Sequence, residues 1–282
     1  MPSLTHHRQK VLLLFGIVVA GVLAVIAYGP VSQWEGYHSF ADQRRSLGIP
    51  NFWNVASNLP FLVVGLAGLF TVRGRSTPGV LPALRPAYLA FFLGTALICL
   101  GSGYYHLAPS DESLVWDRLP MTVTFMAFLA ILIGEQIGPE IGARLLLPLV
   151  TAGLLSVVYW VFTAQHGGGD LRPYVLVQFL PMVLAPLLLL LFPSPFTRPW
   201  LLWGPLVAYG LAKLFEILDV SIFNFLHVVS GHSLKHLAAA LGTHFLLLSA
   251  TRRAKSGQPV AIQPRHVQAT QQDRVALNVP GN

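Results

Sequence analysis

Long apolar stretches recur along the whole chain, and no other feature constrains its fold so strongly. An α-helix needs about 20 predominantly apolar residues to cross the hydrocarbon core of a bilayer. Only helices and closed barrels satisfy all of their backbone hydrogen bonds in that medium. The composition agrees, because 54% of the residues are hydrophobic and only 10% are charged, far below the roughly 25% of soluble domains. The sequence therefore predicts an all-α protein, a polytopic bundle of transmembrane helices.

Eight spans are expected, and their connections are too short to form separate domains. The spans lie near residues 11–29, 54–72, 86–107, 119–137, 144–163, 174–192, 200–218 and 229–250. We divide the chain into an N-terminal cytoplasmic segment with an accessory anchor (1–30), a seven-helix membrane domain (31–251) and a cytoplasmic tail (252–282). The tail is expected to be disordered, because Pro, Gln and Gly replace the apolar pattern there.

The first apolar stretch has two interpretations. Basic residues precede Val11, as they do in a secretory signal peptide, but the apolar run is longer than the core of a usual signal peptide. No cleavage site of small residues follows the run. We therefore expect an uncleaved membrane anchor.

The basic residues of the loops predict the orientation of the chain. Short cytoplasmic loops carry an excess of Lys and Arg. With the N-terminus inside, the inner connections and tail hold Arg73, Arg75, Arg85, Arg144, Arg198, Arg252, Arg253, Lys255, Arg265 and Arg274, whereas the outer connections hold only Arg44, Arg45, Arg118 and Arg172. Both termini are therefore expected to be cytoplasmic. The net charge of +7 is then a topology signal that favours contact with anionic lipid and not with nucleic acid.

Three histidines and an aspartate are expected to meet at the outer face of this bundle. The third span runs outward and ends at His106, and the fourth starts just after Asp117, beyond a turn at 109–113. The eighth span runs inward, so His232 and His236 lie near its outer end. Ionisable residues inside a membrane are costly and are functional candidates by default.

The spacing of these residues suggests a metal site. His232 and His236 lie four positions apart, so on a helix they share one face and can bind one ion together. Ser102 and His106 have the same spacing, which turns the Ser102 hydroxyl toward the site one turn deeper. Three imidazoles with an open fourth position suit a catalytic Zn²⁺, which polarises a carbonyl and activates water. Asp117 would hold that water and accept its proton.

The metal interpretation has a less specific alternative. A histidine pair four residues apart often reflects packing or hydrogen bonds between helices. The addition of His106, Asp117 and Ser102 on the same face is what favours a metal. The remaining histidines are expected in solvated ends, in loops or in packing positions, and the single Cys99 has no partner for a disulfide. Any metal ligands must therefore be nitrogen or oxygen atoms.

Further charged residues lie along the seventh and eighth spans. Lys213 and Glu216 can pair at a spacing of three, with Asp219 one turn further on. Such a pair suits a direct catalytic role and a purely structural role equally well. Lys235 points away from its neighbouring histidines, so we expect it to pair with Glu216 or Asp219 or to extend to the surface.

Two glutamates and two tyrosines receive ordinary assignments. Glu135 and Glu140 fall near the cytoplasmic end of the fourth span, where we expect them to be solvated. Tyr104 and Tyr105 are expected to anchor the chain at the membrane interface, with contact to a substrate headgroup as the alternative.

Three segments of the sequence resemble the alkaline ceramidase family. They are NFWNVASNLPF (51–61), GSGYYHLAPSDESLVWDRLPM (101–121) and SGHSLKHLAAALGTH (230–244). The family signature is a Ser, a His four positions on, an Asp eleven further and a His-x-x-x-His in the last helix. Ser102, His106, Asp117, His232 and His236 reproduce it, and the similarity extends over about 50–250. The family belongs to a superfamily of seven-helix membrane hydrolases that also includes adiponectin-receptor-like proteins.

The resemblance implies a zinc-dependent amidase that hydrolyses the N-acyl bond of ceramide to a sphingoid base and a fatty acid. It implies that the three histidines hold Zn²⁺, that Asp117 activates water and that Ser102 stabilises the developing oxyanion. The lipid substrate would enter sideways from the bilayer.

The chain departs from the family pattern in two places. It has an additional N-terminal span ahead of the seven-helix core. In eukaryotic members an acidic cluster, with a Glu ahead of the Phe-Trp-Asn run, binds calcium. Here Asn51 occupies the position of that Glu, and Glu35 and Asp42 do not fall at matching spacing. We therefore predict no calcium site.

Several functional alternatives stay open. The residues predict hydrolysis of a lipid carbonyl, whereas ceramide rests on the resemblance alone, so another N-acyl lipid or an ester lipid also fits. A zinc-containing lipid receptor or sensor without turnover is a second class. A metal or proton transporter is less favoured, because charged residues do not continue through the midplane. The compact loops and the GIPNFWNV variant (48–55) suggest a bacterial inner membrane, with the site facing the periplasm.

Overall fold

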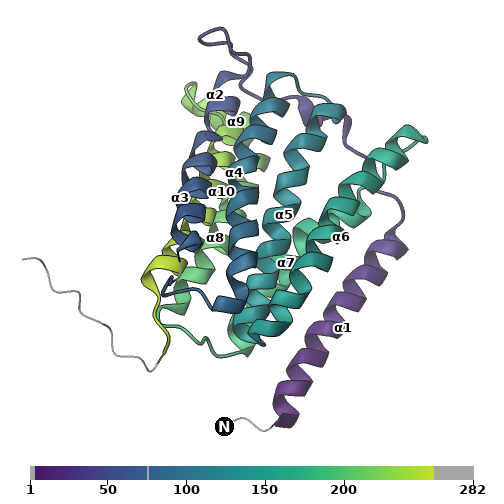
Figure 1. Ribbon diagram of the computed structural model, residues 1–282. Helices are drawn as coiled ribbons and strands as arrows, with labels where there is room; N and C mark the ends of the chain where they lie inside the picture. Colours follow the sequence, from purple (N-terminus) through teal and green to yellow (C-terminus); the bar gives the residue numbers. More distant parts are fainter. Residues whose placement is uncertain (1–3, 75, 257–282) are drawn as a thin grey trace, which may run out of the picture.

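The fold is a bundle of long, apolar helices. The computed structural model describes residues 4–74 and 76–256, and the regular elements in these ranges are helical (Figure 1). Six helical segments are long and apolar enough to cross a membrane: Thr5–Tyr28, Phe52–Arg73, Pro82–Leu107, Asp111–Gln136, Pro139–Gln165 and Arg172–Leu191. The predicted all-α membrane bundle is thereby confirmed, and the chain is a multi-pass membrane protein.

The helices follow one another with short connections. They are α1 (Leu4–Tyr28), α2 (Phe52–Ala56), α3 (Leu59–Arg73), α4 (Arg85–Leu107), α5 (Asp111–Gln136), α6 (Pro139–Gln165), α7 (Arg172–Leu191), α8 (Trp203–Ile217), α9 (Asp219–Leu226) and α10 (Gly231–Arg252), with 3₁₀ turns η1 (Glu35–His38), η2 (Pro82–Leu84) and η3 (Pro199–Leu202). The seventh and eighth predicted spans correspond to α8 and α10. Helix α8 falls outside the set of six because it is short, with 15 residues. Helix α10 is long enough, but Lys235 and its three histidines make it less apolar.

Three local features differ from the sequence-based expectation. The second predicted span is divided into α2 and α3 by a break at Ser57 and Asn58. The expected turn at 109–113 is shorter, because Ser110 forms a capping box with Ser113 and starts α5 at Asp111. Asp117 consequently lies in the second turn of that helix and not ahead of it. The third difference is α9, a short helix in a region that was expected to be a loop.

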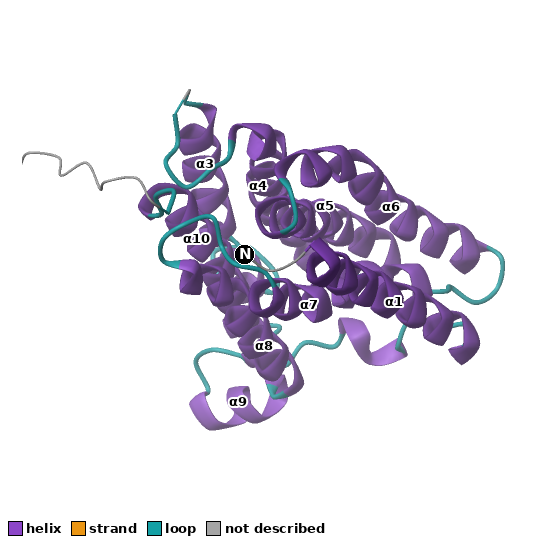
Figure 2. Ribbon diagram, turned by 90° about the horizontal axis from the view of Figure 1, so that it is seen from below, coloured by secondary structure: helices purple, strands orange, loops and turns teal. Residues whose placement is uncertain are grey.

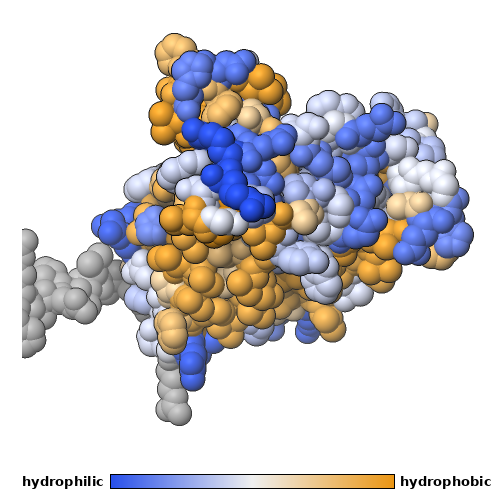
Figure 3. Space-filling view, turned by 90° about the horizontal axis from the view of Figure 1, so that it is seen from above, coloured by the Kyte–Doolittle hydropathy of each residue, from blue (hydrophilic) through white to orange (hydrophobic). Residues whose placement is uncertain are grey.

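Both described ends of the chain lie at one end of the bundle. Helix α1 begins and α10 ends at the bottom of Figure 1, whereas α4 ends and α5 and α10 begin at the top. We call the bottom the inner end and the top the outer end. This arrangement agrees with an even number of crossings. Figure 3 views the outer end, where hydrophilic patches lie beside hydrophobic ones on the surface, as expected where a bundle meets the membrane–water boundary.

Helix α1 lies at the edge of the bundle. It runs beside α7 and has little contact with the other helices (Figure 2). In the most apolar stretch of α1 only 6% of the residues are buried, whereas 72% are buried in the corresponding stretch of α5. The Lys10 ammonium donates to the backbone carbonyl of Leu191 at 2.6 Å and so ties the start of α1 to the end of α7. The remaining helices form the body of the protein without it.

The closest helix contact that concerns the site joins α4 to α5. A Cβ atom at Gly101 would overlap the backbone carbonyl of Trp116. Because glycine has no side chain, the backbones of α4 and α5 can approach each other more closely here than any larger residue would allow. Because Ser102 and Asp117 directly follow these two residues, the close approach brings their helices together at the outer end.

A buried ion pair closes the inner end. The Arg253 guanidinium contacts both carboxylate oxygens of Glu135, at 2.7 and 2.8 Å, and both side chains are fully buried. Arg253 also donates to the Tyr88 hydroxyl at 3.0 Å and to the backbone carbonyls of Ser249 and Gly79. The ion pair therefore connects α4, α5 and the end of α10.

This ion pair corrects one expectation. Glu135 was expected to be solvated, which is wrong, because a partner far along the chain compensates its charge within the bundle. Glu140 is exposed, as expected. At the start of the tail, Ala254 and Ser256 are hydrogen bonded to the segment after α7. Residues 257–282 of the tail lie outside the described residues.

Candidate metal centre and its cavity

Three histidines converge at the outer end of the bundle. His106 comes from the last turn of α4, and His232 and His236 come from the first turns of α10. All three side chains are buried, and one potential ligand nitrogen from each lies within 4.8 Å of the others. The Nε2 atoms of His106 and His232 are 3.4 Å apart. The structure thus brings together the three residues that the sequence predicted as metal ligands.

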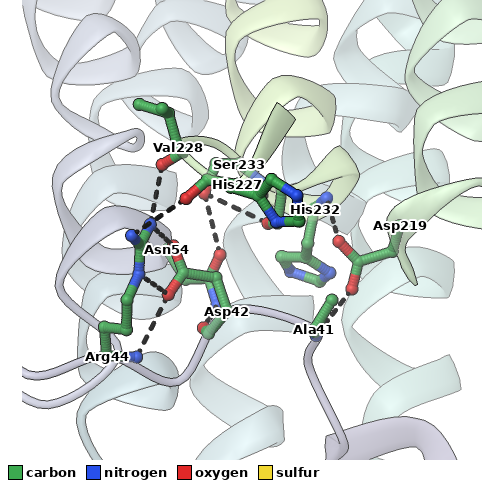
Figure 4. Close-up of polar contacts among 10 residues, drawn as sticks. Ala41, Asp42, Arg44, Asn54, Asp219, His227, Val228, His232 and Ser233 are labelled. Carbon is green, nitrogen blue, oxygen red and sulfur yellow. Dashed lines mark hydrogen bonds and ion pairs between the residues drawn. The ribbon is translucent and has the colours of Figure 1, made fainter. Parts of the chain in front are cut away.

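The helix ends that carry these histidines are fixed by polar contacts. The Asp219 carboxylate accepts hydrogen bonds from the backbone N–H groups of His232, at 2.7 Å, and Ala41, at 3.0 Å (Figure 4). Ser230 caps α10 by accepting a hydrogen bond from the backbone N–H of Ser233. These contacts set where α10 begins and therefore which way its first turn presents the histidines.

Two polar residues at the α2–α3 break contact His236. The Ser57 hydroxyl lies 2.8 Å from Nδ1 of His236, and the Asn58 side-chain amide nitrogen lies 3.4 Å from the same atom. With Nδ1 engaged, Nε2 is the atom left for a metal. Neither Ser57 nor Asn58 was predicted as a site residue. The available signal was the polar set Asn54, Ser57 and Asn58 at positions i, i+3 and i+4 in an otherwise apolar span.

The third ligand candidate is oriented by its backbone. The Asn51 side-chain amide donates to the backbone carbonyl of His106 at 2.9 Å, at the end of α4. Nδ1 of His106 is buried and has no hydrogen-bond partner among the described residues. The last turn of α4 is therefore held through its main chain, while both ring nitrogens of His106 stay free of protein partners other than the neighbouring histidine.

A phenyl ring packs against two of the three histidines. The ring centroid of Phe40 lies 4.7 Å from that of His106 and 4.4 Å from that of His232. Phe40 is itself buried, with 5% of its surface exposed. It therefore provides an apolar surface directly beside two of the proposed ligands.

Residues 29–51 cross the outer end as a segment that we call the strap. His38 contacts the Tyr105 hydroxyl at 2.9 Å and the Asp111 carboxylate at 3.2 Å. Further on, the Arg44 guanidinium contacts Asp42 and donates to the backbone carbonyls of His227 and Val228 (Figure 4). The strap is thus attached to α4, to α5 and to the connection before α10.

The Asp42 carboxylate of the strap is held in its charged form. Burial raises the pKa of this carboxyl, but the hydrogen bonds and charge of Arg44 outweigh burial and leave the pKa below its usual value. The backbone carbonyl of Asp42 also accepts a hydrogen bond from Asn54 at 3.0 Å, and Ser233 donates to the Asn54 side chain. Glu35, the other acidic residue considered for calcium, lies in η1.

Asp117 and Ser102 lie on the inner side of the histidines. Ser102 is buried, and its hydroxyl is within hydrogen-bonding reach of the Asp117 carboxylate. Asp117, Ser102 and His236 all line one cavity of about 380 Å³. The predicted acid–base and hydroxyl groups therefore share a cavity with one of the metal-ligand candidates.

The cavity extends from these polar groups into an apolar interior. Its walls come mainly from α4, α5, α7, α8 and α10, and the apolar part includes Phe91, Phe125, Phe128 and Met182. One polar wall holds an ion network, in which Glu216 contacts the ammonium groups of Lys213 and of Lys235, the latter at 3.0 Å. The expected pairing of Lys235 with Glu216 is confirmed. Asp219 does not join this network, because it binds backbone N–H groups instead.

The donor set suits a borderline metal ion. Three neutral imidazoles are typical ligands for zinc and similar divalent ions. A tetrahedral ion with bonds of 2.0–2.1 Å to nitrogen requires ligand atoms about 3.3 Å apart, close to the 3.4 Å between Nε2 of His106 and of His232. Two ring nitrogens that face each other without an intervening hydroxyl or carboxylate favour a shared cation. The three histidines could therefore hold a metal ion beside an acid–base group and a hydroxyl.

Comparison with known proteins yields one family match. A family model described as Ceramidase matches residues 44–184, which is half of the chain. The matched region includes Ser102, His106 and Asp117, whereas His232 and His236 lie beyond it. No curated protein matches the sequence significantly.

Proposed function

Because this chain belongs to the ceramidase family, we propose that it is a zinc-dependent amidase that hydrolyses ceramide or a related N-acyl lipid within the membrane. The products would be a free fatty acid and an amine such as sphingosine. The observation that carries this proposal is the convergence of three buried histidines within 4.8 Å at the polar end of an apolar cavity. The apolar cavity can accommodate lipid chains, and the three histidines can hold the metal of a hydrolytic centre.

The proposed metal ligands are His106, His232 and His236. Zinc bound there would polarise the amide carbonyl and lower the pKa of a water molecule, which makes that water nucleophilic at neutral pH. Ser57 would hold His236 in the required ring orientation through Nδ1. Phe40 would provide an apolar surface beside two of these ligands.

Asp117 is proposed as the general base and acid. Hydrolysis adds the oxygen of water to the amide carbon and breaks the bond between that carbon and nitrogen. The Asp117 carboxylate would accept a proton from the water and return it to the leaving nitrogen, which departs as an amine. Its position beside Ser102 on the cavity wall supports this role.

Ser102 is proposed to stabilise charge on the reacting carbonyl. As the carbon becomes tetrahedral, the carbonyl oxygen gains negative charge and needs hydrogen-bond donors. The Ser102 hydroxyl is buried and lines the cavity next to Asp117. It is therefore suited to donate to that oxygen in the transition state.

The proposed location is a bacterial inner membrane, with both termini cytoplasmic and the site near the periplasmic face. The position of the site at the end opposite to both described chain ends supports this orientation. The polar strap crosses that same end. The substrate would reach the cavity from the bilayer.

The first test combines metal analysis with a lipid assay. Purified wild type should contain about one zinc per chain and release fatty acid from N-acyl lipids, and chelation should abolish the release. His106→Ala should lose both properties. His244→Ala, which replaces a histidine of α10 outside the trio, is the matched control and should keep them.

Asp117→Asn separates metal binding from catalysis. This variant should retain zinc and lose roughly 10²–10⁴-fold in turnover, the usual contribution of a general acid–base group. Full activity of Asp117→Asn would remove the proposed base. Zinc without turnover of any lipid in wild type would favour a receptor or sensor, and absence of zinc would contradict the metal centre.

A further inference from the structure

One arginine in the cavity wall has hydrogen-bond acceptors for only part of its guanidinium group. Arg118, in the second turn of α5, has only 3% of its surface exposed and lines the same cavity as Asp117. Its Nη2 donates to the side-chain oxygen of Gln33 in the strap at 2.6 Å. Its Nε and Nη1 atoms are buried and have no hydrogen-bond partner among the described residues. Two of the three nitrogens of this cation are therefore unsatisfied.

Aromatic rings hold this guanidinium without satisfying it. Its central carbon lies 4.2 Å from the ring centroid of Trp160, 4.7 Å from that of Tyr174 and 5.6 Å from that of Tyr37. Ring contacts of this kind stabilise the positive charge, but the N–H groups in the plane of the guanidinium still need acceptors. Leaving a buried, charged donor without one is costly. The aromatic rings fix the orientation of the group, and its Nε and Nη1 atoms remain without an acceptor among the described residues at the cavity wall.

The other cations of the cavity wall are already paired. Lys213 and Lys235 both contact the Glu216 carboxylate. Among the described residues, Arg118 is the one cation of the cavity lining that forms no salt bridge. Since Asp117 and Glu216 are the carboxylates of the lining, the cavity carries one more cation than anion. The excess positive charge favours an anionic ligand.

The position of Arg118 indicates which part of a lipid it would meet. Arg118 directly follows Asp117 near the outer end of α5, whereas Phe125 and Phe128 line the cavity deeper along the same helix. Phe128 lies about 15 Å inward from Arg118 by the rise of a helix. An acyl chain belongs in the apolar part. The scissile carbonyl would lie beside Asp117, so the group at Arg118 belongs to the amine portion of the substrate.

We propose that the physiological substrate is an N-acyl lipid whose amine portion carries a carboxylate, as in an N-acyl amino acid, and that Arg118 binds this carboxylate. The inference rests on the proposed amidase function and specifies its substrate class. Arginine is suited to the task, because its planar N–H groups match the geometry of a carboxylate. The same chemistry occurs in the carboxylate of a released fatty acid, so the test must distinguish headgroup from product.

The test compares two substrates with the same acyl chain. N-oleoylglycine and N-oleoylethanolamine differ in that one ends in a carboxylate and the other in a hydroxymethyl group. Zinc-loaded wild type should prefer N-oleoylglycine in kcat/KM by roughly ten- to hundredfold, the range expected for hydrogen bonds to a charged group. Arg118→Gln should reduce this preference to near unity, mainly through KM, and Arg118→Lys should restore part of it. Arg45→Gln, at an exposed arginine of the strap, is the control and should keep the preference.

Three outcomes would overturn the substrate assignment. The first is a wild-type preference for the neutral lipid. The second is an equal loss on both lipids in Arg118→Gln, which would make Arg118 a structural residue. The third is Arg118-dependent inhibition by oleate without a preference for N-oleoylglycine, which would assign the carboxylate to the product.

A binding measurement separates failure of this inference from failure of the amidase function. Equilibrium binding of N-oleoylglycine and N-oleoylethanolamine to Asp117→Asn, with and without Arg118→Gln, needs no turnover. If wild type cleaves neither lipid but the carboxylate is bound tenfold more tightly in an Arg118-dependent way, the amidase function fails and the anion site stands. If binding shows no preference while cleavage proceeds, the amidase stands and the anion site fails.

Discussion

The two ends of the bundle both bury an arginine, but they treat it in opposite ways. At the inner end Arg253 donates to Glu135, to Tyr88 and to two backbone carbonyls, so each of its nitrogens has a partner. At the outer end Arg118 has one partner, Gln33, and two nitrogens without any. A buried charge whose hydrogen bonds are complete holds helices together. A buried charge whose hydrogen bonds are incomplete indicates that a ligand belongs beside it.

The same contrast applies to the histidines and the carboxylates. Nδ1 of His106 has no partner and its Nε2 faces another imidazole, whereas both oxygens of Glu135 accept hydrogen bonds. Among the described residues, the outer end thus holds unsatisfied nitrogens of an arginine and a histidine, and the inner end leaves the neutral side-chain amide of Gln136 unsatisfied. The two ends therefore differ in whether their buried charged groups are fully paired, and substitutions at either end can test this difference.

The largest expected effect is a loss of stability at the inner end, where the hydrogen bonds of the buried arginine are complete. Arg253→Met removes one partner of a fully buried ion pair and leaves the Glu135 charge uncompensated, which should lower the free energy of unfolding by about 3–5 kcal/mol. Thermal and denaturant unfolding in detergent would measure the change. Arg252→Met is the matched control, because Arg252 is exposed in the same turn, and it should change stability little. Equal stability of both variants would contradict the structural role of the ion pair.

A smaller effect is expected where α4 and α5 approach each other. Gly101→Ala places a methyl group against the Trp116 carbonyl and should force the two backbones apart, at a cost of about 1–3 kcal/mol. Because Asp117 follows Trp116, turnover should also fall. Gly103→Ala, where the added methyl would meet no atom within 4 Å, should leave both properties near wild type. Unfolding and fatty-acid release, measured together, would show whether only the first substitution is harmful.

The next effect concerns the orientation of one proposed ligand. Ser57→Ala removes the hydroxyl beside Nδ1 of His236 and should weaken zinc binding by about 10–100-fold, as the loss of such supporting contacts does elsewhere. Competition with a zinc chelator of known affinity would measure it. Ser57→Thr should restore most of the affinity. Ser156→Ala, at a buried serine that bonds only within its own helix, should leave zinc binding unchanged, and equal zinc affinity in Ser57→Ala and wild type would exclude this role for Ser57.

The smallest effect is a pH dependence at Asp170, whose carboxylate accepts a hydrogen bond from the backbone N–H of Val31 in the strap. Burial raises the pKa of Asp170, but hydrogen bonds from Arg172, Tyr159 and the backbone of Val31 lower it to about 2, against a usual 3.8. A lowered folded-state pKa means that this group stabilises the protein above about pH 4 and that its contribution disappears as the pH falls toward 2. Melting curves at pH 5 and pH 3 should show a smaller acid-induced loss in Asp170→Asn than in wild type. Identical losses would exclude Asp170 as the group that titrates.

The sequence-based predictions were most accurate where the signal is local. Apolar runs located the membrane helices, and the spacings of four residues within α4 and α10 identified side chains that the structure brings together. The charge bias of the loops placed His106 and the histidine pair at one face, and they do lie at the same end of the bundle. These patterns are properties of single helices and need no knowledge of packing.

The errors arose where partners are far apart in the chain. Glu135 and Arg253 lie in different helices, and nothing near Glu135 in sequence signals a cation, so solvation was the reasonable but wrong expectation. Arg118 received a role only as an outer-loop charge, because its aromatic neighbours Trp160 and Tyr174 come from α6 and α7. Helix α9 is too short to be separated from a loop by periodicity.

The ion pair at the inner end also has a mechanical consequence for the outer end. It joins α4, α5 and α10. The opposite ends of these three helices carry His106, Asp117 and His236. The ion pair is therefore a common pivot about which the three helices would tilt. Tyr88 and His106 are about 27 Å apart along α4 by the helical rise. A tilt of roughly 2° about that pivot moves the far end of the helix by about 1 Å, a misplacement that can reduce catalysis by about a hundredfold. Substitutions in this ion pair should therefore reduce turnover, although the substituted residues do not contact the site.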